Sequence, residues 1–365
     1  MVEPALKAAA LVVGIVAVLA FPGFADGPFI MSVAVVIASY AVLATAWNFV
    51  GGFTGYISLG HAAYSGIGGY ATGLLILKAD VSPWLALFLG AVIVAVIAVP
   101  VGIASLRVRG ASFVIVSIAV VLIMLLVFQS WGEFTGGANG LRVPRPFPED
   151  VLRPEQHIRF YYLHVALMAV LLVTWWAIDR SRFGTGLKAI REDEDKAQSL
   201  GVPTFTYKLI AFVISAFFTA IGGGLYALWF GFLDPIFQFS ILIGAYMVLM
   251  ALLGGIRSLF GPLLGAVIVG YAVELFKAQY GDTQFHLVAT GLLLGVVVLF
   301  MPDGIIPAAQ SLLDRFRPES SSIREMTAEE LLEQQRQSGD LPPGPDSDAA
   351  RAGDRPARTR EEVRR

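Results

Sequence analysis

The chain has 365 residues, of which 56% are hydrophobic and only 15% are charged. A soluble domain carries about 25% charged residues, so the surface of this protein cannot be mainly aqueous. The net charge of −2 argues against a nucleic-acid partner, and the absence of cysteine excludes disulfides and thiolate metal sites. The four histidines do not share a metal-ligand spacing, so we predict no metal site and no cofactor bound by this chain.

Long apolar runs follow one another along the chain, each close to the roughly 20 residues that cross a hydrocarbon core of about 30 Å. They lie at 5–22, 30–50, 55–77, 83–106, 112–131, 160–178, 207–230, 238–256, 262–279 and 284–301. We therefore predict an all-α polytopic membrane protein with about ten transmembrane helices. We interpret the first run as a retained span rather than a secretory signal peptide, because its apolar stretch is long.

The split between the second and third runs falls on a glycine-rich stretch at 51–55. This stretch is either a tight turn between two spans or an unwound point within one. Irregular backbone at membrane depth is tolerated only where protein or a water-filled cavity covers it, so such glycines are candidate pathway elements. The alternative is that these small residues let neighbouring helices pack closely. The residues alone do not separate the two interpretations.

Basic residues indicate the side of the membrane on which a loop lies, because cytoplasmic loops carry an excess of Lys and Arg. The connection 179–208 holds six of them, at Arg180, Arg182, Lys188, Arg191, Lys196 and Lys208. We therefore predict that this connection is cytoplasmic. Counting helices from it places Arg107, Arg109, Arg257 and both termini on the same side. The loop 132–159 is an exception, because it holds four arginines and falls outside.

The composition divides the chain into two parts. Residues 1–308 form the predicted membrane domain, in which a loop at 179–206 is the largest charged connection. Residues 309–365 form a tail that is rich in Glu, Arg, Asp, Pro and Ser. Such a segment cannot bury enough apolar surface to offset the entropy cost of folding, so we expect a mostly disordered cytoplasmic tail.

The charged loop contains a segment that is typical of a short amphipathic helix. Its residues from Leu187 to Leu200 are good helix formers, and Gly201 followed by Pro203 is a stop signal. At helical spacing, four apolar side chains fall on one side, namely Leu187, Ile190, Ala197 and Leu200. Such a helix is suited to docking in a groove on a partner. It is equally suited to lying on the membrane surface, and the pattern does not choose between these.

This segment carries a family resemblance. Residues 189–194, followed by Ala197 and 199–201, resemble the coupling motif of branched-chain amino acid ABC-transporter permeases of the LivM type. Further stretches that resemble the motifs of this family lie at 47–61, 107–110, 135–141, 253–255, 261–262 and 302–307. The resemblance covers about residues 30–308, with the motifs in the order of the family.

The resemblance implies the permease subunit of an importer for leucine, isoleucine and valine in the bacterial inner membrane. It implies four kinds of partner: a homologous second permease, two ATP-binding subunits, a periplasmic or lipid-anchored solute-binding protein, and the amino acid itself. The chain has no Gly-Lys-Ser or Gly-Lys-Thr and so no P-loop. We therefore expect that this subunit is not an enzyme and that ATP and magnesium bind to the partner ATPase subunits.

Two other functions are consistent with parts of the sequence. A permease for urea or short-chain amides is the nearest, since such permeases share much of the motif pattern. A stand-alone secondary transporter or channel is the alternative class. That class predicts several carboxylates or cation sites within the spans, and this sequence has almost none. It also leaves the charged loop without a role.

The resemblance assigns coupling to the ATPase to ten residues of the loop: Leu187, Ala189, Ile190, Arg191, Glu192, Asp193, Glu194, Ala197, Leu200 and Gly201. We predict that most of the docking energy comes from Ile190, Ala197 and Leu200. The charged side chains add salt bridges that are worth only ~0–1 kcal/mol each when they are exposed.

Candidate pathway residues are the polar and glycine positions inside the spans. These are Asn48, Gly51, Gly52, Ser58, His61, Tyr64 and Glu274. His61 and Tyr64 share a helix face, which suits a polar patch beside a cavity, although hydrogen bonds between packed helices explain them equally well. Glu274 lies within an apolar run with Lys277 one turn later, and we favour an internal ion pair near the outer surface over a pathway role.

Overall fold

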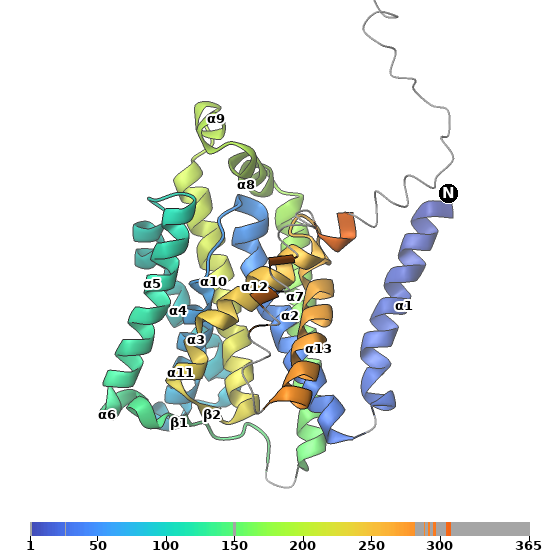
Figure 1. The fold of residues 1–365 in the computed structure, drawn as a ribbon, viewed down its shortest axis with the longest axis vertical. Coiled ribbons are helices and arrows are strands. Elements are labelled where there is room, and N and C mark those ends of the chain that lie inside the picture. Colours follow the sequence, from blue (N-terminus) through green and yellow to red (C-terminus); the bar gives the residue numbers. More distant parts are fainter. Residues whose placement is uncertain are drawn as a thin grey trace, which may run out of the picture. The chain divides into compact units, whose positions relative to one another are not determined.

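The computed structural model describes residues 2–25, 27–148 and 151–281, together with 288, 291–292, 295–296 and 304–307. The chain divides into two units, 1–311 and 312–365, and all described residues belong to the first. Nearly all the described elements are helices (Figure 1). In chain order they are α1 (Val2–Phe24), α2 (Pro28–Thr54), α3 (His61–Ala79), α4 (Pro83–Ser105), α5 (Ala111–Ser130), α6 (Gly132–Thr135), the 3-10 turn η1 (Gly137–Asn139), β1 (Leu141–Arg142), α7 (Arg153–Asp179), α8 (Arg182–Glu192), α9 (Glu194–Ser199), α10 (Thr204–Phe230), β2 (Phe232–Leu233), α11 (Pro235–Gln238), α12 (Ile241–Gly254) and α13 (Gly261–Tyr280).

Seven helical stretches among the described residues are long and apolar enough to cross a membrane. They are Pro28–Thr54, Pro83–Ser105, Ala111–Ser130, Pro154–Asp179, Thr204–Phe230, Pro235–Gly254 and Gly261–Tyr280. Each coincides with one of the predicted runs, so the prediction of an all-α polytopic membrane protein is confirmed for these seven. Helices α1 and α3 occupy two further predicted runs. The tenth run, 284–301, lies almost entirely outside the described residues, and the tail 309–365 lies outside them completely.

Helix α1 meets the other helices through two tyrosines of α7. The Tyr161 hydroxyl donates to the Val18 carbonyl and the Tyr162 hydroxyl donates to the Leu19 carbonyl, each at 2.9 Å. Pro22 lies four residues after Val18 and has no N–H, so it leaves the Val18 carbonyl without its helical partner. The Tyr161 hydroxyl fills that position and compensates for the proline inside the helix.

Helices α3 and α10 are in close contact through small residues. A Cβ atom on Gly223 of α10 would lie 2.1 Å from the Ser65 carbonyl oxygen of α3, so only glycine permits this approach. Small residues of this kind let membrane helices pack backbone to backbone. At the end of α10, β1 and β2 form a two-residue antiparallel ladder in which Leu141 faces Leu233.

The chain is not helical at 55–60, directly after α2. Gly51 and Gly52 belong to α2, and Gly55 ends it in a left-handed conformation with φ +75°. The predicted helical run 55–77 is therefore wrong over its first six residues, and the interruption lies just beyond the glycine pair. The helix ends because Gly55 takes a left-handed conformation that does not continue it. The Gly55 N–H caps the end by donating to the Gly51 carbonyl.

The segment 55–60 folds back along α2 instead of leaving the bundle. The Trp47 Nε1–H donates to the Ser58 carbonyl at 2.6 Å, and His61, the first residue of α3, contacts Ser215, whose hydroxyl donates to the Ala46 carbonyl. Since Ala46 lies eight residues before the end of α2, the His61 side chain at the start of α3 reaches the bundle interior rather than its surface. Backbone of this kind is tolerated only because protein covers it.

A second segment enters the bundle from the opposite end. After β2, the short helix α11 and Phe239 lead to α12, which has only 14 residues. Phe239 lies against Gly66 and stacks on Tyr70. The inner ends of the two segments meet where Gly244 lies against Leu59, since a Cβ atom on Gly244 would be 2.5 Å from the Leu59 carbonyl oxygen. Elements β1, β2 and α6 lie at the end opposite to α8 and α9 (Figure 1).

Candidate functional site

The α8–α9 segment consists of two short helices rather than the single predicted helix. Ser181 caps α8 by accepting from the Gly184 N–H, and Asp193 caps α9 by accepting from the N–H groups of Asp195 and Lys196. The extended Asp193 (φ −162°) breaks the helix because its carboxylate satisfies the next N–H groups better than helical continuation would. The backbone N–H and the side chain of Lys196 hold the pKa of the Asp193 carboxyl below its ordinary value.

The apolar face of the segment is buried against the chain's own helices. Leu187, Ile190 and Ala197 are fully buried, in one cluster with Leu171 and Trp175 of α7. Ile190 and Ala197 therefore anchor the segment to its own bundle, and their contribution to docking energy stays a prediction. The amphipathic pattern was correct, but the surface that it covers belongs to this chain.

Leu200 differs from the rest of that face. It follows α9 directly and is 84% exposed. Its neighbours Gln198, Ser199 and Gly201 are exposed as well, and Gly201 has a φ of +85° that turns the chain toward α10. Leu200 is therefore the large apolar side chain that α9 presents outward.

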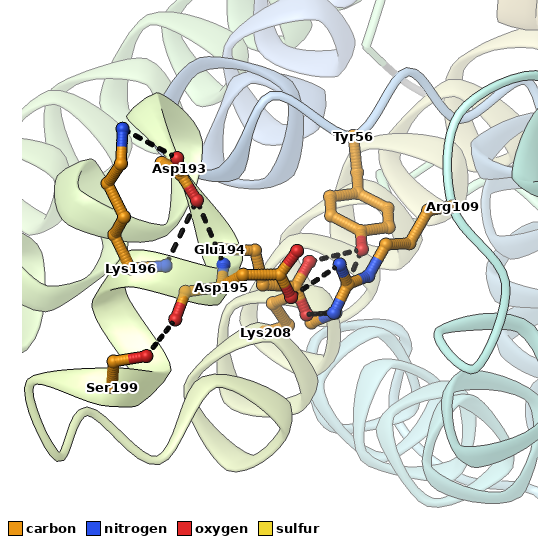
Figure 2. A network of polar contacts seen from close by, with 8 residues as sticks. All are labelled: Tyr56, Arg109, Asp193, Glu194, Asp195, Lys196, Ser199 and Lys208. Carbon is orange, nitrogen blue, oxygen red and sulfur yellow. Dashed lines mark hydrogen bonds and ion pairs between the residues drawn. The ribbon is translucent and has the colours of Figure 1, made fainter.

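A charged cluster joins α9 to the junction between α2 and α3 (Figure 2). The Lys208 ammonium is 2.5 Å from Glu194 Oε1, and the Tyr56 hydroxyl donates to Glu194 Oε2 at 2.7 Å. The Lys208 ammonium also donates to the Tyr56 hydroxyl at 2.9 Å. Arg109, from the turn between α4 and α5, lies 3.3 Å from Glu194 and 2.9 Å from Asp195. Two cations and two carboxylates thus balance one another.

The cluster is closed to solvent at its centre and open at its rim. Lys208 is 3% exposed and Glu194 12% exposed, whereas Arg109 and Asp195 are mostly exposed. Burial and the hydrogen bond to Glu194 raise the pKa of the Tyr56 hydroxyl well above its ordinary value. Tyr56 therefore remains a neutral phenol that both donates and accepts hydrogen bonds within the cluster.

A second contact joins α8 to the same junction. The Arg191 guanidinium donates to the Gly52 carbonyl at 2.7 Å, one of the last carbonyls of α2. Arg191 also packs against Gly55, whose Cβ position would be 3.2 Å from Arg191 Cγ. Arg191 and Glu194, two of the predicted coupling residues, thus lie against the junction from both sides of Asp193.

Sequence reasoning did not assign Tyr56, Arg109 or Lys208 to the site. Lys208 offered a signal, since it is a charge at the start of the apolar run 207–230 and a buried charge requires a partner. Tyr56 and Arg109 lie in stretches that carry the family resemblance, but neither stretch indicates that their side chains meet.

The predicted pathway residues other than Glu274 lie along the end of α2, the 55–60 segment and the start of α3. Ser58 and Tyr64 line a cavity with Gly60, Ser105 and Ser117, and the cavity has room for about one water molecule. The Leu59 N–H donates to the Ser117 hydroxyl, while the buried hydroxyl of Ser105 has no partner among the described residues.

Two further candidates are buried polar side chains in contact with packed helices. His61 Nε2 lies 2.7 Å from the Ser215 hydroxyl, and because that hydroxyl donates to Ala46, the imidazole donates through Nε2. Asn48 is 1% exposed, and neither polar atom of its amide has a hydrogen-bond partner in the part of the chain that the structure describes. It lies beside Gly52, where the Ile256 carbonyl also approaches.

Glu274 belongs to a separate place in the fold, on α13. Its carboxylate is 2.8 Å from the ammonium of Lys277, so the predicted ion pair is present. Within the described ranges, no group of three or more histidine, aspartate or glutamate side chains is placed to hold a metal ion.

Comparison with known proteins identifies the family. Residues 29–302 match the model of the branched-chain amino acid transport system permease component. The chain belongs to this family. No solved structure matches it. Together with the seven membrane-crossing stretches, membership makes the protein a multi-pass inner-membrane permease component.

Curated relatives agree with this assignment. The chain is 29% identical to the high-affinity branched-chain amino acid transport system permease protein LivM of Salmonella typhimurium, over 73% of this chain and 68% of LivM. It is 28% identical to the permease protein LivH of the same organism, over 74% of this chain and 91% of LivH. A shorter match, 28% identical over 32% of this chain and 35% of the relative, is to the guanosine ABC transporter permease protein NupQ of Bacillus subtilis.

Proposed function

We propose that this chain is a translocating subunit of an ATP-driven importer for leucine, isoleucine and valine, and that it docks to an ATP-binding partner through α9 and Leu200. The relatives LivM and LivH, each matched over most of its length, support the substrate class. The exposed leucine at the end of an otherwise anchored segment supports the docking site.

The proposed orientation places the α8–α9 end of the bundle in the cytoplasm. Six basic residues of the connection 179–208 support this, and two more lie beside them, because Arg109 contacts Glu194 and Arg257 lies 3.7 Å from Glu192. In this orientation both termini are cytoplasmic. The four arginines of 132–159 remain an exception to the positive-inside rule.

The proposed assembly follows from what the chain lacks and what its relatives are. Since the sequence has no P-loop, ATP and magnesium bind to two partner ATPase subunits. LivM and LivH are both permease proteins of high-affinity systems, which supports a homologous second permease. A periplasmic or lipid-anchored solute-binding protein delivers the amino acid. In this arrangement the substrate is selected largely before it reaches the membrane.

The docking site is tested with the variant Leu200→Asp. The side chain is exposed, so the change leaves folding and membrane insertion intact, but it places a charge in the docking contact. We expect co-purification of the ATP-binding subunits to be lost and uptake of radiolabelled leucine to fall to background. The matched control is Leu152→Asp, a leucine that is 72% exposed at the start of α7, which retains both. Normal uptake by Leu200→Asp would contradict the docking assignment.

The same assay tests the substrate. Leucine uptake by the wild-type complex should be competed by isoleucine and valine and not by guanosine, urea or acetamide. Competition by guanosine alone would reassign the substrate to nucleosides, in line with the NupQ match. Competition by urea or acetamide would favour the amide permeases.

A further inference from the structure

The α8–α9 segment holds the α2–α3 junction at two points. Arg191 donates to the Gly52 carbonyl before the left-handed Gly55, and Glu194 accepts from the Tyr56 hydroxyl directly after it. Arg191 and Glu194 lie on either side of Asp193, where α8 ends and α9 begins. The break between α8 and α9 is therefore hydrogen-bonded to the break between α2 and α3.

The contact between α9 and Tyr56 is strong because the Tyr56 hydroxyl bonds to both members of a buried ion pair, Glu194 of α9 and Lys208 of α10. Glu194 and Lys208 are almost completely removed from water, and separating them would leave an uncompensated charge in the bundle. Hydrogen bonds that involve ionised partners are also shorter and stronger than neutral ones. Tyr56 has two of these, one to each charge. A displacement of α9 therefore carries Tyr56 with it.

The segment beyond Tyr56 is suited to move. Residues 55–60 are not helical, and the bonds that hold Ser58 and Leu59 come from single side chains, Trp47 and Ser117. A cavity lies beside the segment, and the buried Ser105 hydroxyl on its wall has no hydrogen-bond partner among the described residues.

We propose that Arg191, Glu194, Lys208 and Tyr56 form a junction clamp that stays closed and transmits movement of the α8–α9 segment to the segment 55–60 and the start of α3. Tyr56 is then a positioning residue for transport. This inference rests on the proposed function, because it requires that a partner moves α9. It adds the link by which that movement enters the membrane-spanning part of the chain.

The first experiment measures the clamp itself, without any partner. A Cβ atom on Gly55 would lie 4.0 Å from Arg191 Cβ, a separation at which two cysteines form a disulfide, and the native chain has no cysteine. In membranes, Gly55→Cys/Arg191→Cys should form this disulfide under mild oxidation. Adding Tyr56→Phe should slow its formation about tenfold, since a bond to a charged group is lost. Adding Tyr70→Phe, which removes a hydroxyl that donates to the Leu233 carbonyl at the other end of the bundle, should leave the rate unchanged.

The second experiment measures coupling in the complete transporter in proteoliposomes. Tyr56→Phe should assemble with its partners and hydrolyse ATP at the wild-type rate, while leucine uptake per ATP falls about tenfold. Tyr70→Phe should not change this ratio. In the Tyr56→Phe background, oxidising the Gly55→Cys/Arg191→Cys pair should restore uptake per ATP, because the covalent link replaces the clamp. The Gly55→Cys single variant is the reference for strain at the left-handed Gly55, and the Arg191→Cys single variant is the reference for loss of the Arg191 bond to the Gly52 carbonyl.

Each outcome decides one claim. An unchanged disulfide rate in Tyr56→Phe would overturn the clamp. A slower rate with normal uptake per ATP, or with ATP hydrolysis and uptake falling in proportion, would overturn its role in coupling. Absence of ATP-binding subunits from the wild-type preparation would refute the proposed function, and the disulfide rates in membranes would still report on the clamp.

Discussion

Two junctions at the α8–α9 end of the molecule each begin with a pair of glycines but differ in how they contact the α8–α9 segment. One follows Gly51-Gly52 between α2 and α3, and the other follows Gly254-Gly255 between α12 and α13. The first folds back into the bundle and is joined to α9 through the Tyr56 hydroxyl, which bonds to both members of the buried pair of Glu194 in α9 and Lys208 in α10. The second is joined to α8 by the ion pair of Arg257 and Glu192, which lie 3.7 Å apart and are each more than 60% exposed.

The difference shows that a contact to the α8–α9 segment does not by itself make a mechanical link. An exposed ion pair contributes little and separates at little cost, because water replaces each partner. A buried pair cannot separate without exposing a charge to a low-dielectric interior. We therefore expect the first junction, and not the second, to move with α9. Substitutions that weaken the contacts of each junction test this comparison.

The largest effect is expected from Lys208→Met. The methionine keeps the apolar stem but removes the cation that faces Glu194, which should lower the free energy of unfolding by about 3 kcal/mol. The thermal unfolding midpoint of the purified chain in detergent measures this. Lys188→Met is the control, since Lys188 and Asp179 form a 2.7 Å pair that is partly exposed, and it should cost less than about 1 kcal/mol. Equal effects of the two changes would remove the distinction between buried and exposed pairs.

A smaller effect is expected from Gly244→Ala. The added methyl group would meet the Leu59 carbonyl 2.5 Å away, so α12 and the segment 55–60 must separate at a cost of about 2 kcal/mol. The same unfolding midpoint reports this cost. Gly132→Ala, where the added methyl group meets open space, should leave the midpoint unchanged. A neutral Gly244→Ala would show that the inner end of the first junction is not tightly packed.

The smallest effect is expected from Arg257→Ala at the second junction. Its ion pair with Glu192 is exposed, so the free energy of unfolding should change by less than about 0.5 kcal/mol. Uptake per ATP in proteoliposomes should stay within twofold of wild type, in contrast to Tyr56→Phe. A loss of coupling in Arg257→Ala as large as that in Tyr56→Phe would mean that both junctions transmit movement.

The sequence by itself determined the fold class and the seven stretches that cross the membrane, because length and hydropathy are local properties of the chain. It also located the segment at 187–200 and its apolar face, since helical periodicity is visible in a single sequence. The ion pair between Glu274 and Lys277 was predictable for the same reason, because its partners lie one helical turn apart.

Only the tertiary structure decided what covers the apolar face and where the charges pair. Periodicity shows that Ile190 and Ala197 share a side of a helix, but it does not show that α7 of the same chain occupies that side. The cluster of Tyr56, Glu194 and Lys208 joins residues up to 152 positions apart, and no local pattern encodes such a meeting. Long-range packing brings these side chains together, and a buried lysine that must find a carboxylate is the physical reason that they stay there.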